Sequence, residues 1–198
     1  QQSSVQHSPF EYREINKWLL KAAQNGHPQA QYELGINIQN GQGCEADHQK
    51  GLAWLQTSAL QNFLPAKILV ANKKLATKDL TEHKVALDIL RQSLISHNVV
   101  PKLELAWHLV ASEFDQLQNP QEALTILDDL PVHQVDKVRF IETRAAAYAA
   151  LGDFDQAIEI QLEAKEQAEE LGWQDIPDIE FRLQQYRDKQ VSKGSYYL

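Results

Sequence analysis

The chain contains no methionine and a single cysteine, Cys44, among its 198 residues. One cysteine excludes an intrachain disulfide and a metal site built from several thiolates. No stretch approaches the roughly 18 consecutive apolar residues that a membrane-spanning helix needs, so we expect no direct membrane insertion. The missing methionine and the polar opening, QQSSVQHS, are typical of a mature exported chain, so we expect the bacterial periplasm or envelope. The alternatives are a cytoplasmic location and a fragment of a larger protein.

Positive charge is scarce in the second half of the chain. Residues 1–100 contain ten Lys and Arg against eight Asp and Glu, whereas residues 101–198 contain nine against nineteen. An acidic surface repels nucleic acid and anionic lipid, so we expect no nucleic-acid partner. The simpler interpretation is a solvated acidic face that keeps the protein in solution.

Residue types recur at fixed distances, which indicates a repeat architecture. In the first half the pairs 36 residues apart are Trp18 and Trp54, Ala23 and Ala59, and Ala30 and Ala66. In the second half the pairs 34 residues apart are Ala111 and Ala145, Phe114 and Tyr148, and Ala123 and Ala157. One helix pair cannot bury its apolar face alone, so such repeats must stack on one another.

Each period predicts two helices with a turn between them. The glycines of Gly41-Gln42-Gly43 allow the chain to leave a helix and reverse, and Asp47 is placed to cap the helix that follows. Small residues such as Gly35 mark positions where two helix axes approach closely. The complete pattern predicts ten helices, near residues 11–25, 28–40, 47–61, 64–77, 82–96, 101–117, 120–130, 135–151, 154–171 and 177–190.

The first half resembles the Sel-one-like repeat (SLR). The motifs that carry the resemblance are WLLKAA at residues 18–23, GHPQAQYELG at 26–35 and GQG at 41–43. The likeness weakens along residues 11–100. Asn62 stands where a glycine is usual, and residues 72–74 are not followed by a glycine loop, so we expect the loop after residue 76 to differ in shape.

The second half resembles the tetratricopeptide repeat (TPR) over residues 101–171. The motif AALGDFDQAIE at residues 149–159 is its most typical segment, whereas Gln161 fills a position that is usually aromatic. The resemblance implies an all-α fold, a right-handed α-α superhelix that is a solenoid of antiparallel helix pairs. The concave groove is then lined by the first helix of each pair.

The ends of the chain complete the predicted organisation. Residues 1–10 are expected to form a flexible segment, and residues 172–198 a capping helix and tail. In the capping helix an apolar stripe that includes Ile179 and Tyr186 is predicted to lie opposite Arg182. The tail from Val191 to Leu198 is predicted to fray or to lead into a further segment.

The TPR resemblance also implies which residues face the groove. The implied partner-binding positions are Tyr32, Ile36, Gln39, Asn40, His108, Ser112, Asp115, Arg139 and Glu142. Two interpretations of Arg139 stay open, because it could bind a partner carboxylate or pair with Glu142 on the same helix.

Residues suited to catalysis are few, and we predict no catalytic, metal-binding or cofactor-binding residues. Cys44 is expected to be a buried structural thiol and not a nucleophile, since no basic neighbour favours its thiolate. Glu104 and His108 have i, i+4 spacing, but two ligands without a third are more typical of a solvated pair. The tryptophans at 18, 54 and 107 are expected to pack between helices, and Trp173 either to staple the last helix or to stand exposed.

We therefore predict a protein–protein interaction scaffold that binds a partner peptide or helix and requires no cofactor. The identity of the partner and the oligomeric state are not determined by the sequence. One alternative is a hydrolase, because a few Sel-one-like repeat proteins have been credited with that activity. The other is a positioning module of a larger envelope or signalling protein.

Overall fold

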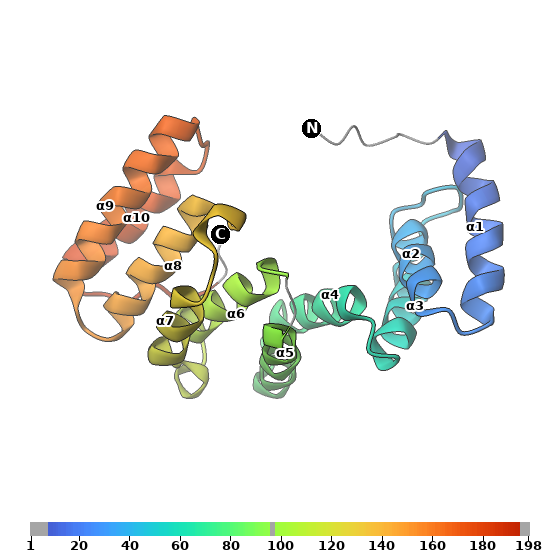
Figure 1. Ribbon diagram of the computed structural model, residues 1–198, viewed down its shortest axis with the longest axis horizontal. Helices are drawn as coiled ribbons and strands as arrows, with labels where there is room; N and C mark the ends of the chain where they lie inside the picture. Colours follow the sequence, from blue (N-terminus) through green and yellow to red (C-terminus); the bar gives the residue numbers. More distant parts are fainter. Residues whose placement is uncertain (1–7, 96–97, 195–198) are drawn as a thin grey trace. The chain divides into compact units, whose positions relative to one another are not determined.

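The computed structural model describes residues 8–95 and 98–194, and every regular element in these ranges is a helix (Figure 1). The α-helices are α1 (Pro9–Gln24), α2 (Pro28–Gln39), α3 (His48–Leu60), α4 (Leu64–Leu75), α5 (Leu80–Gln92), α6 (Val100–Ala111), α7 (Pro120–Asp128), α8 (Lys137–Ala150), α9 (Phe154–Leu171) and α10 (Ile176–Arg187). Three short 3₁₀ helices are η1 (Ser93–Ile95), η2 (Asp115–Leu117) and η3 (Val132–Gln134). The predicted all-α solenoid is confirmed. None of the helices in the described ranges combines the length and the apolar character that a membrane span requires.

Side-chain caps set several of the helix starts. Asp47 accepts a hydrogen bond from the backbone N–H of Lys50 at 2.9 Å, and Asp153 accepts one from Gln156 at 3.2 Å. Both satisfy N–H groups that the helix itself leaves unpaired, and the cap at Asp47 was predicted. Helix α1 begins at Pro9, earlier than predicted, because Ser8 and Glu11 form a capping box. Residues 1–7 of the predicted flexible segment lie outside the described residues.

Helix α6 ends at Ala111, well before the predicted residue 117. Ser112 leaves the helical conformation, with φ of −55° and ψ of 136°. The carbonyls of the last helical turn are then satisfied from elsewhere in the chain. Leu109 accepts from the N–H of Asn119 at 2.7 Å, and Ala111 accepts from the N–H of Gly194 at 2.6 Å. Non-local hydrogen bonds of this kind leave no periodic signal in the sequence.

The chain forms two compact units, unit 1 (Gln1–Ile89) and unit 2 (Leu90–Leu198), which divide within α5. In unit 1, α1, α2, α3 and α4 pack in succession, each against the helix before it (Figure 1). In unit 2 the same succession runs from α6 to α10, and α8 packs against both α6 and α7. Sequential antiparallel pairs are therefore the organising element of each unit.

Two glycines allow α2 and α3 to approach closely. A Cβ atom on Gly35 would lie 2.8 Å from Cγ of Leu55 and 2.9 Å from the carbonyl oxygen of Gly51. A Cβ atom on Gly51 would lie 2.7 Å from the carbonyl oxygen of Gly35. The close contact at Gly35 was predicted, whereas its partner Gly51 was not.

Two turns lie at the places where the sequence departs from the Sel-one-like repeat pattern. Asn62 takes a left-handed φ of 62°, like Gly26 with φ of 84°, which lies 36 residues earlier. Asparagine tolerates this conformation, so the turn survives without glycine. The link after α4 occupies only residues 76–79, whereas the link after α2 occupies residues 40–47. The predicted difference between these loops is confirmed.

The predicted packing role of the tryptophans holds for two of the three. Trp107 is buried, and Trp54 packs against the cluster of Ala23, Ala30, Leu34 and Ile38. Trp18 is 70% exposed, so the prediction for this residue is wrong. Its repeat equivalent Trp54 packs on the α1–α2 pair, whereas α1 itself packs chiefly against α2 within the described residues. Trp173 staples α10, since it packs against the cluster of Val138, Ala168 and Ile179.

The core of unit 2 depends on alanines at the pair interface. Ala145 and Ala157 have no exposed surface and pack with Ala149 and Tyr186. We expect Ala157→Leu to overpack this interface and to lower the free energy of unfolding by about 1–3 kcal/mol, measured by chemical denaturation.

The control for this substitution is Ala53→Leu on α3, where the side chain is exposed. It adds the same atoms without a neighbour to displace, so its stability should match that of the wild type. Equal stability of both variants would show that the helix-pair register described for α8 and α9 is incorrect.

Candidate functional site

A groove of about 830 Å³ opens in unit 1 between α1, α2 and the start of α3. Leu20, Leu34 and Ile38 form its apolar side. Its polar side comes from Arg13, Asn16 and Lys17 on α1, together with residues 44–50 from the loop and the first turn of α3. The groove combines an apolar surface with a few polar groups, which is the composition expected of a binding site.

The charged groups of this groove differ in how far they are already engaged. Lys17 pairs with Glu14 at 2.5 Å, and Asp47 accepts the N-cap hydrogen bond of α3. Within the described part of the chain, the side chains of Arg13, Lys50 and Glu45 make no ion pair. Two cations and one carboxylate therefore remain available to a ligand.

The loop between α2 and α3 is held against α1 by a glycine and an amide. A Cβ atom on Gly43 would lie 2.5 Å from the backbone carbon of Tyr12, so only glycine fits there. Asn16 donates to the carbonyl of Gln42 at 2.6 Å and accepts from Asn37 at 2.8 Å. Because Gly43 takes the position against α1, Cys44 turns outward and is exposed. The prediction of a buried thiol is wrong.

The partner-binding positions predicted on α2 do not line this groove. Tyr32 is half-buried and lies 5.6 Å from the ring of Phe63. Gln39 donates to the carbonyl of His48 at 3.3 Å, and Ile36 is half-buried. Asn40 is exposed at the C-cap of α2. The groove uses Leu34 and Ile38 on another face of the same helix, together with residues of α1 that sequence reasoning missed.

The structure places two predicted positions of unit 2 at the end of α6. Ser112 is the buried C-cap residue, and its hydroxyl accepts from the N–H of Phe114 at 3.2 Å. Asp115 is exposed and forms an ion pair with Lys193 at 2.5 Å. His108 is half-buried on the same helix. Of these three residues, Asp115 contacts the chain's own C-terminal segment.

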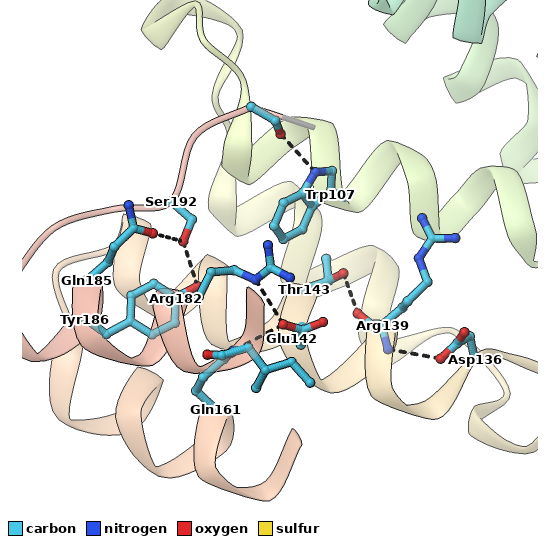
Figure 2. A network of polar contacts seen from close by, with 12 residues as sticks. Trp107, Asp136, Arg139, Glu142, Thr143, Gln161, Arg182, Gln185, Tyr186 and Ser192 are labelled. Carbon is cyan, nitrogen blue, oxygen red and sulfur yellow. Dashed lines mark hydrogen bonds and ion pairs between the residues drawn. The ribbon is translucent and has the colours of Figure 1, made fainter. Parts of the chain in front are cut away.

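Arg139 and Glu142 on α8 have different surroundings. Glu142 is only 1% exposed and accepts from Nε of Arg182 at 2.9 Å and from Nε2 of Gln161 at 3.1 Å (Figure 2). Arg139 is half-buried, and its backbone N–H donates to the capping carboxylate of Asp136 at 3.1 Å. The buried carboxylate of Glu142 serves the contact between α8, α9 and α10.

Arg182 was predicted on the solvent face of the capping helix, and this prediction is wrong. Its side chain is 8% exposed, and its guanidinium lies 5.7 Å from the ring of Trp107. Gln161, which fills a position that is usually aromatic, is fully buried and also donates to the carbonyl of Ile179 at 3.1 Å. The amide nitrogen of Gln161 donates to two acceptors at once, which a phenylalanine at this position could not do.

Tyr186 extends this polar network toward the C-terminus. Its hydroxyl lies 3.2 Å from the hydroxyl of Ser192, which in turn lies 3.1 Å from Oε1 of Gln185 (Figure 2). Burial raises the pKa of the Tyr186 phenol to about 12, because the ionised form would lose its hydration. Val191–Leu198 was predicted to fray or to lead into a further segment, but Ser192 is 6% exposed and Gly194 is hydrogen-bonded to Ala111 of α6, so this part of the tail is not frayed. Residues 195–198 lie outside the described residues.

The described residues contain no group of three or more His, Cys, Asp or Glu side chains that could hold a metal ion. Cys44 lines the unit 1 groove, where its thiol lies 3.8 Å from the carbonyl oxygen of Gln42. The arrangement in this groove is therefore suited to binding a ligand through apolar contact and charge.

Comparison with known proteins supports the repeat assignment of the first half. Residues 16–27 and 28–63 match the family model of the Sel1 repeat. A search of curated proteins found no match. Among solved structures, the chain is similar to a Sel1 repeat protein from Oxalobacter formigenes, with a TM-score of 0.54 and 21% sequence identity. The similarity covers 81% of this chain and 65% of that one, and at this identity it shows the fold alone. The tetratricopeptide likeness of residues 101–171 stays a prediction.

The buried pair of Arg182 and Glu142 generates a stability prediction. Arg182→Met leaves a carboxylate buried without its cation, so we expect the free energy of unfolding to fall by about 3–5 kcal/mol. The double variant Glu142→Leu/Arg182→Met removes both charges and should recover most of that loss. Chemical denaturation of the single and double variants measures both effects.

Lys165→Met is the matched control, because Lys165 pairs with Glu180 at 2.7 Å on the surface. It should leave the melting temperature nearly unchanged. If the Arg182→Met and Glu142→Leu losses simply add in the double variant, the two side chains are not coupled and the described contact is incorrect.

The raised pKa of Tyr186 predicts a loss of stability at alkaline pH. The phenol titrates at its ordinary value of 10.0 in the unfolded chain but at about 12 in the folded one. Between these values the unfolded state releases a proton that the folded state keeps. Stability therefore falls as pH rises from 10 to 12, by about 2–3 kcal/mol from this residue. Denaturation midpoints across this range should fall more steeply for the wild type than for Tyr186→Phe, and parallel curves would contradict the assignment.

Proposed function

We propose that this protein is an interaction scaffold that holds a partner peptide in the groove of unit 1. The observation that carries the proposal is the groove itself, which has an apolar side and two cations that make no ion pair with any residue the structure describes. The proposal is further supported by the repeat type, since Sel1 repeat proteins are generally protein-interaction scaffolds. All lining residues except Arg13 belong to the matched repeat segment.

The shape and the residues of the groove suit an extended segment. Leu20 is 38% exposed, so an aliphatic side chain placed on it would bury apolar surface that the folded chain leaves in water. The groove is formed by helices that pack tightly through Gly35, Gly51 and Gly43. A preformed site of this kind does not have to be ordered when the partner binds, which lowers the free-energy cost of binding.

The charges favour an acidic partner. Arg13 presents a planar guanidinium that can bind a carboxylate through two hydrogen bonds, and Lys50 adds a second cation at the start of α3. Glu45 opposes a run of consecutive carboxylates, so the best ligand has isolated acidic residues. The proposed partner is therefore a peptide segment with an aliphatic anchor flanked by Asp or Glu.

A peptide selection tests this proposal. A random peptide library would be selected on the immobilised full chain, and enriched peptides would be titrated by calorimetry. We expect them to combine an aliphatic residue with Asp or Glu. Arg13→Glu and Leu20→Asp should each weaken binding at least tenfold, about 1.4 kcal/mol, because they remove the carboxylate contact and the apolar contact.

Leu60→Asp is the matched control, since Leu60 is 85% exposed on α3 and lies outside the groove. Its affinity should equal that of the wild type. If selected peptides bind Arg13→Glu as tightly as the wild type and instead lose affinity with Arg139→Ala, the binding site lies on unit 2 and the proposal for unit 1 is wrong.

A further inference from the structure

The C-terminal segment of the chain returns from α10 to the end of α6. Gly194 donates its backbone N–H to the carbonyl of Ala111 at 2.6 Å, and its own carbonyl accepts from the indole N–H of Trp107 at 3.2 Å. Both backbone groups of one tail residue are therefore used on α6. This contact joins residues more than 80 positions apart in the sequence.

The end of α6 has the chemistry to receive such a segment. The carbonyls of the last helical turn have no partner within the helix, and this end carries partial negative charge. Ala111 offers one such carbonyl. Asp115, just after the helix, adds a full negative charge and pairs with Lys193 at 2.5 Å. The adjacent residues Lys193 and Gly194 match both groups: the N–H of Gly194 pairs with the free carbonyl, and the ammonium of Lys193 pairs with the carboxylate of Asp115.

The backbone conformation of the tail restricts which residues can occupy position 194. Gly194 has a φ of 99°, which residues other than glycine rarely adopt. A Cβ atom at this position would touch nothing within 4 Å. The requirement for glycine therefore comes from the backbone and not from lack of space. Ser192 provides a second anchor, buried beside the hydroxyl of Tyr186.

We propose that the end of α6, with Trp107, Ala111 and Asp115, is a binding surface for extended segments that carry a lysine followed by a glycine, and that residues 192–194 are its resident ligand. A partner segment with the same pair of residues binds there by displacing the tail. Of the groove positions predicted from the sequence, His108 lies in the last turn of α6, Ser112 is its C-cap and Asp115 follows in η2. The proposal is independent of the unit 1 groove, so either can fail without the other.

The displacement can be tested with the tail sequence itself. The probe is a dye-labelled synthetic peptide of residues 188–198, DKQVSKGSYYL. The full chain would carry Lys193→Glu and Gly194→Pro, which reverse the charge and remove the N–H that Ala111 accepts. We expect the peptide to bind this release variant at least tenfold more tightly than the wild type, measured by fluorescence anisotropy. Titration extends to about 1 mM, the effective concentration that a short tether supplies.

Charge reversal tests whether the ion pair between Asp115 and Lys193 determines which peptide binds. Combining Asp115→Lys with Gly194→Pro, while keeping Lys193 so that the chain's own tail is repelled, should reverse the preference, so that a peptide with glutamate in place of Lys193 binds better than the wild-type peptide. Lys84→Glu, an exposed charge reversal on α5, is the matched control and should behave as the wild type. Circular dichroism and a thermal melt establish that each variant is folded. If the double variant Lys193→Glu/Gly194→Pro does not fold, Lys193→Glu alone is used as the release variant.

Two results would overturn the proposal. One is a folded release variant that shows no peptide binding at the highest concentration, or that binds no better than the wild type. The other is a concentration-dependent dimer of the wild type that Gly194→Pro abolishes in sedimentation velocity. In that case the tail docks on a second copy and is not the resident ligand of its own chain.

Discussion

Two helix axes approach closely only where the side chains between them are small, and the stacking of helices in both units depends on this constraint. Gly35 and Gly51 meet it between α2 and α3, where either Cβ atom would collide with the opposite backbone. Ala145 and Ala157 meet it between α8 and α9, with no exposed surface. A pair joined this tightly still presents one apolar face, so the next helix must cover it. The groove of unit 1 lies where α1, α2 and the loop held by Gly43 meet.

Unit 2 adds a polar constraint to the apolar one. Arg182 and Gln161 both direct donors at the buried carboxylate of Glu142, so three helices contribute to one cluster. Burying these charges has a desolvation cost, which the hydrogen bonds offset only when the geometry is right. A shift of α10 along α8 would separate the guanidinium from the carboxylate. The cluster therefore favours a single placement of the capping helix, whereas apolar packing alone tolerates small shifts.

The two proposed surfaces recognise their ligands by different physical means. The groove of unit 1 uses side chains, an aliphatic contact at Leu20 and the cation of Arg13. The end of α6 uses mostly backbone groups, with Asp115 as its one charged contact. Backbone recognition is tolerant of side chains but strict about conformation, which is why a glycine at φ of 99° matters there. One chain can in this way hold two segments of different composition.

Periodicity by itself determined the helices, their order and several of their caps, because apolar spacing and capping residues act within one or two turns. Asp47, Asp153 and Asn62 all behave as local rules predict. Local rules did not show that Trp18 stays exposed, that Cys44 turns outward or that Arg182 is buried. Each of these depends on how helices and loops pack together. Within the described residues α1 packs chiefly against α2. Gly43 lies against the backbone of Tyr12, and Arg182 donates to the carboxylate of Glu142. The candidate sites belong to the same class. Arg13 and Lys50 lie in one groove, and Asp115 pairs with Lys193, because the fold brings distant segments together. No periodic pattern in the sequence indicates which of these segments meet.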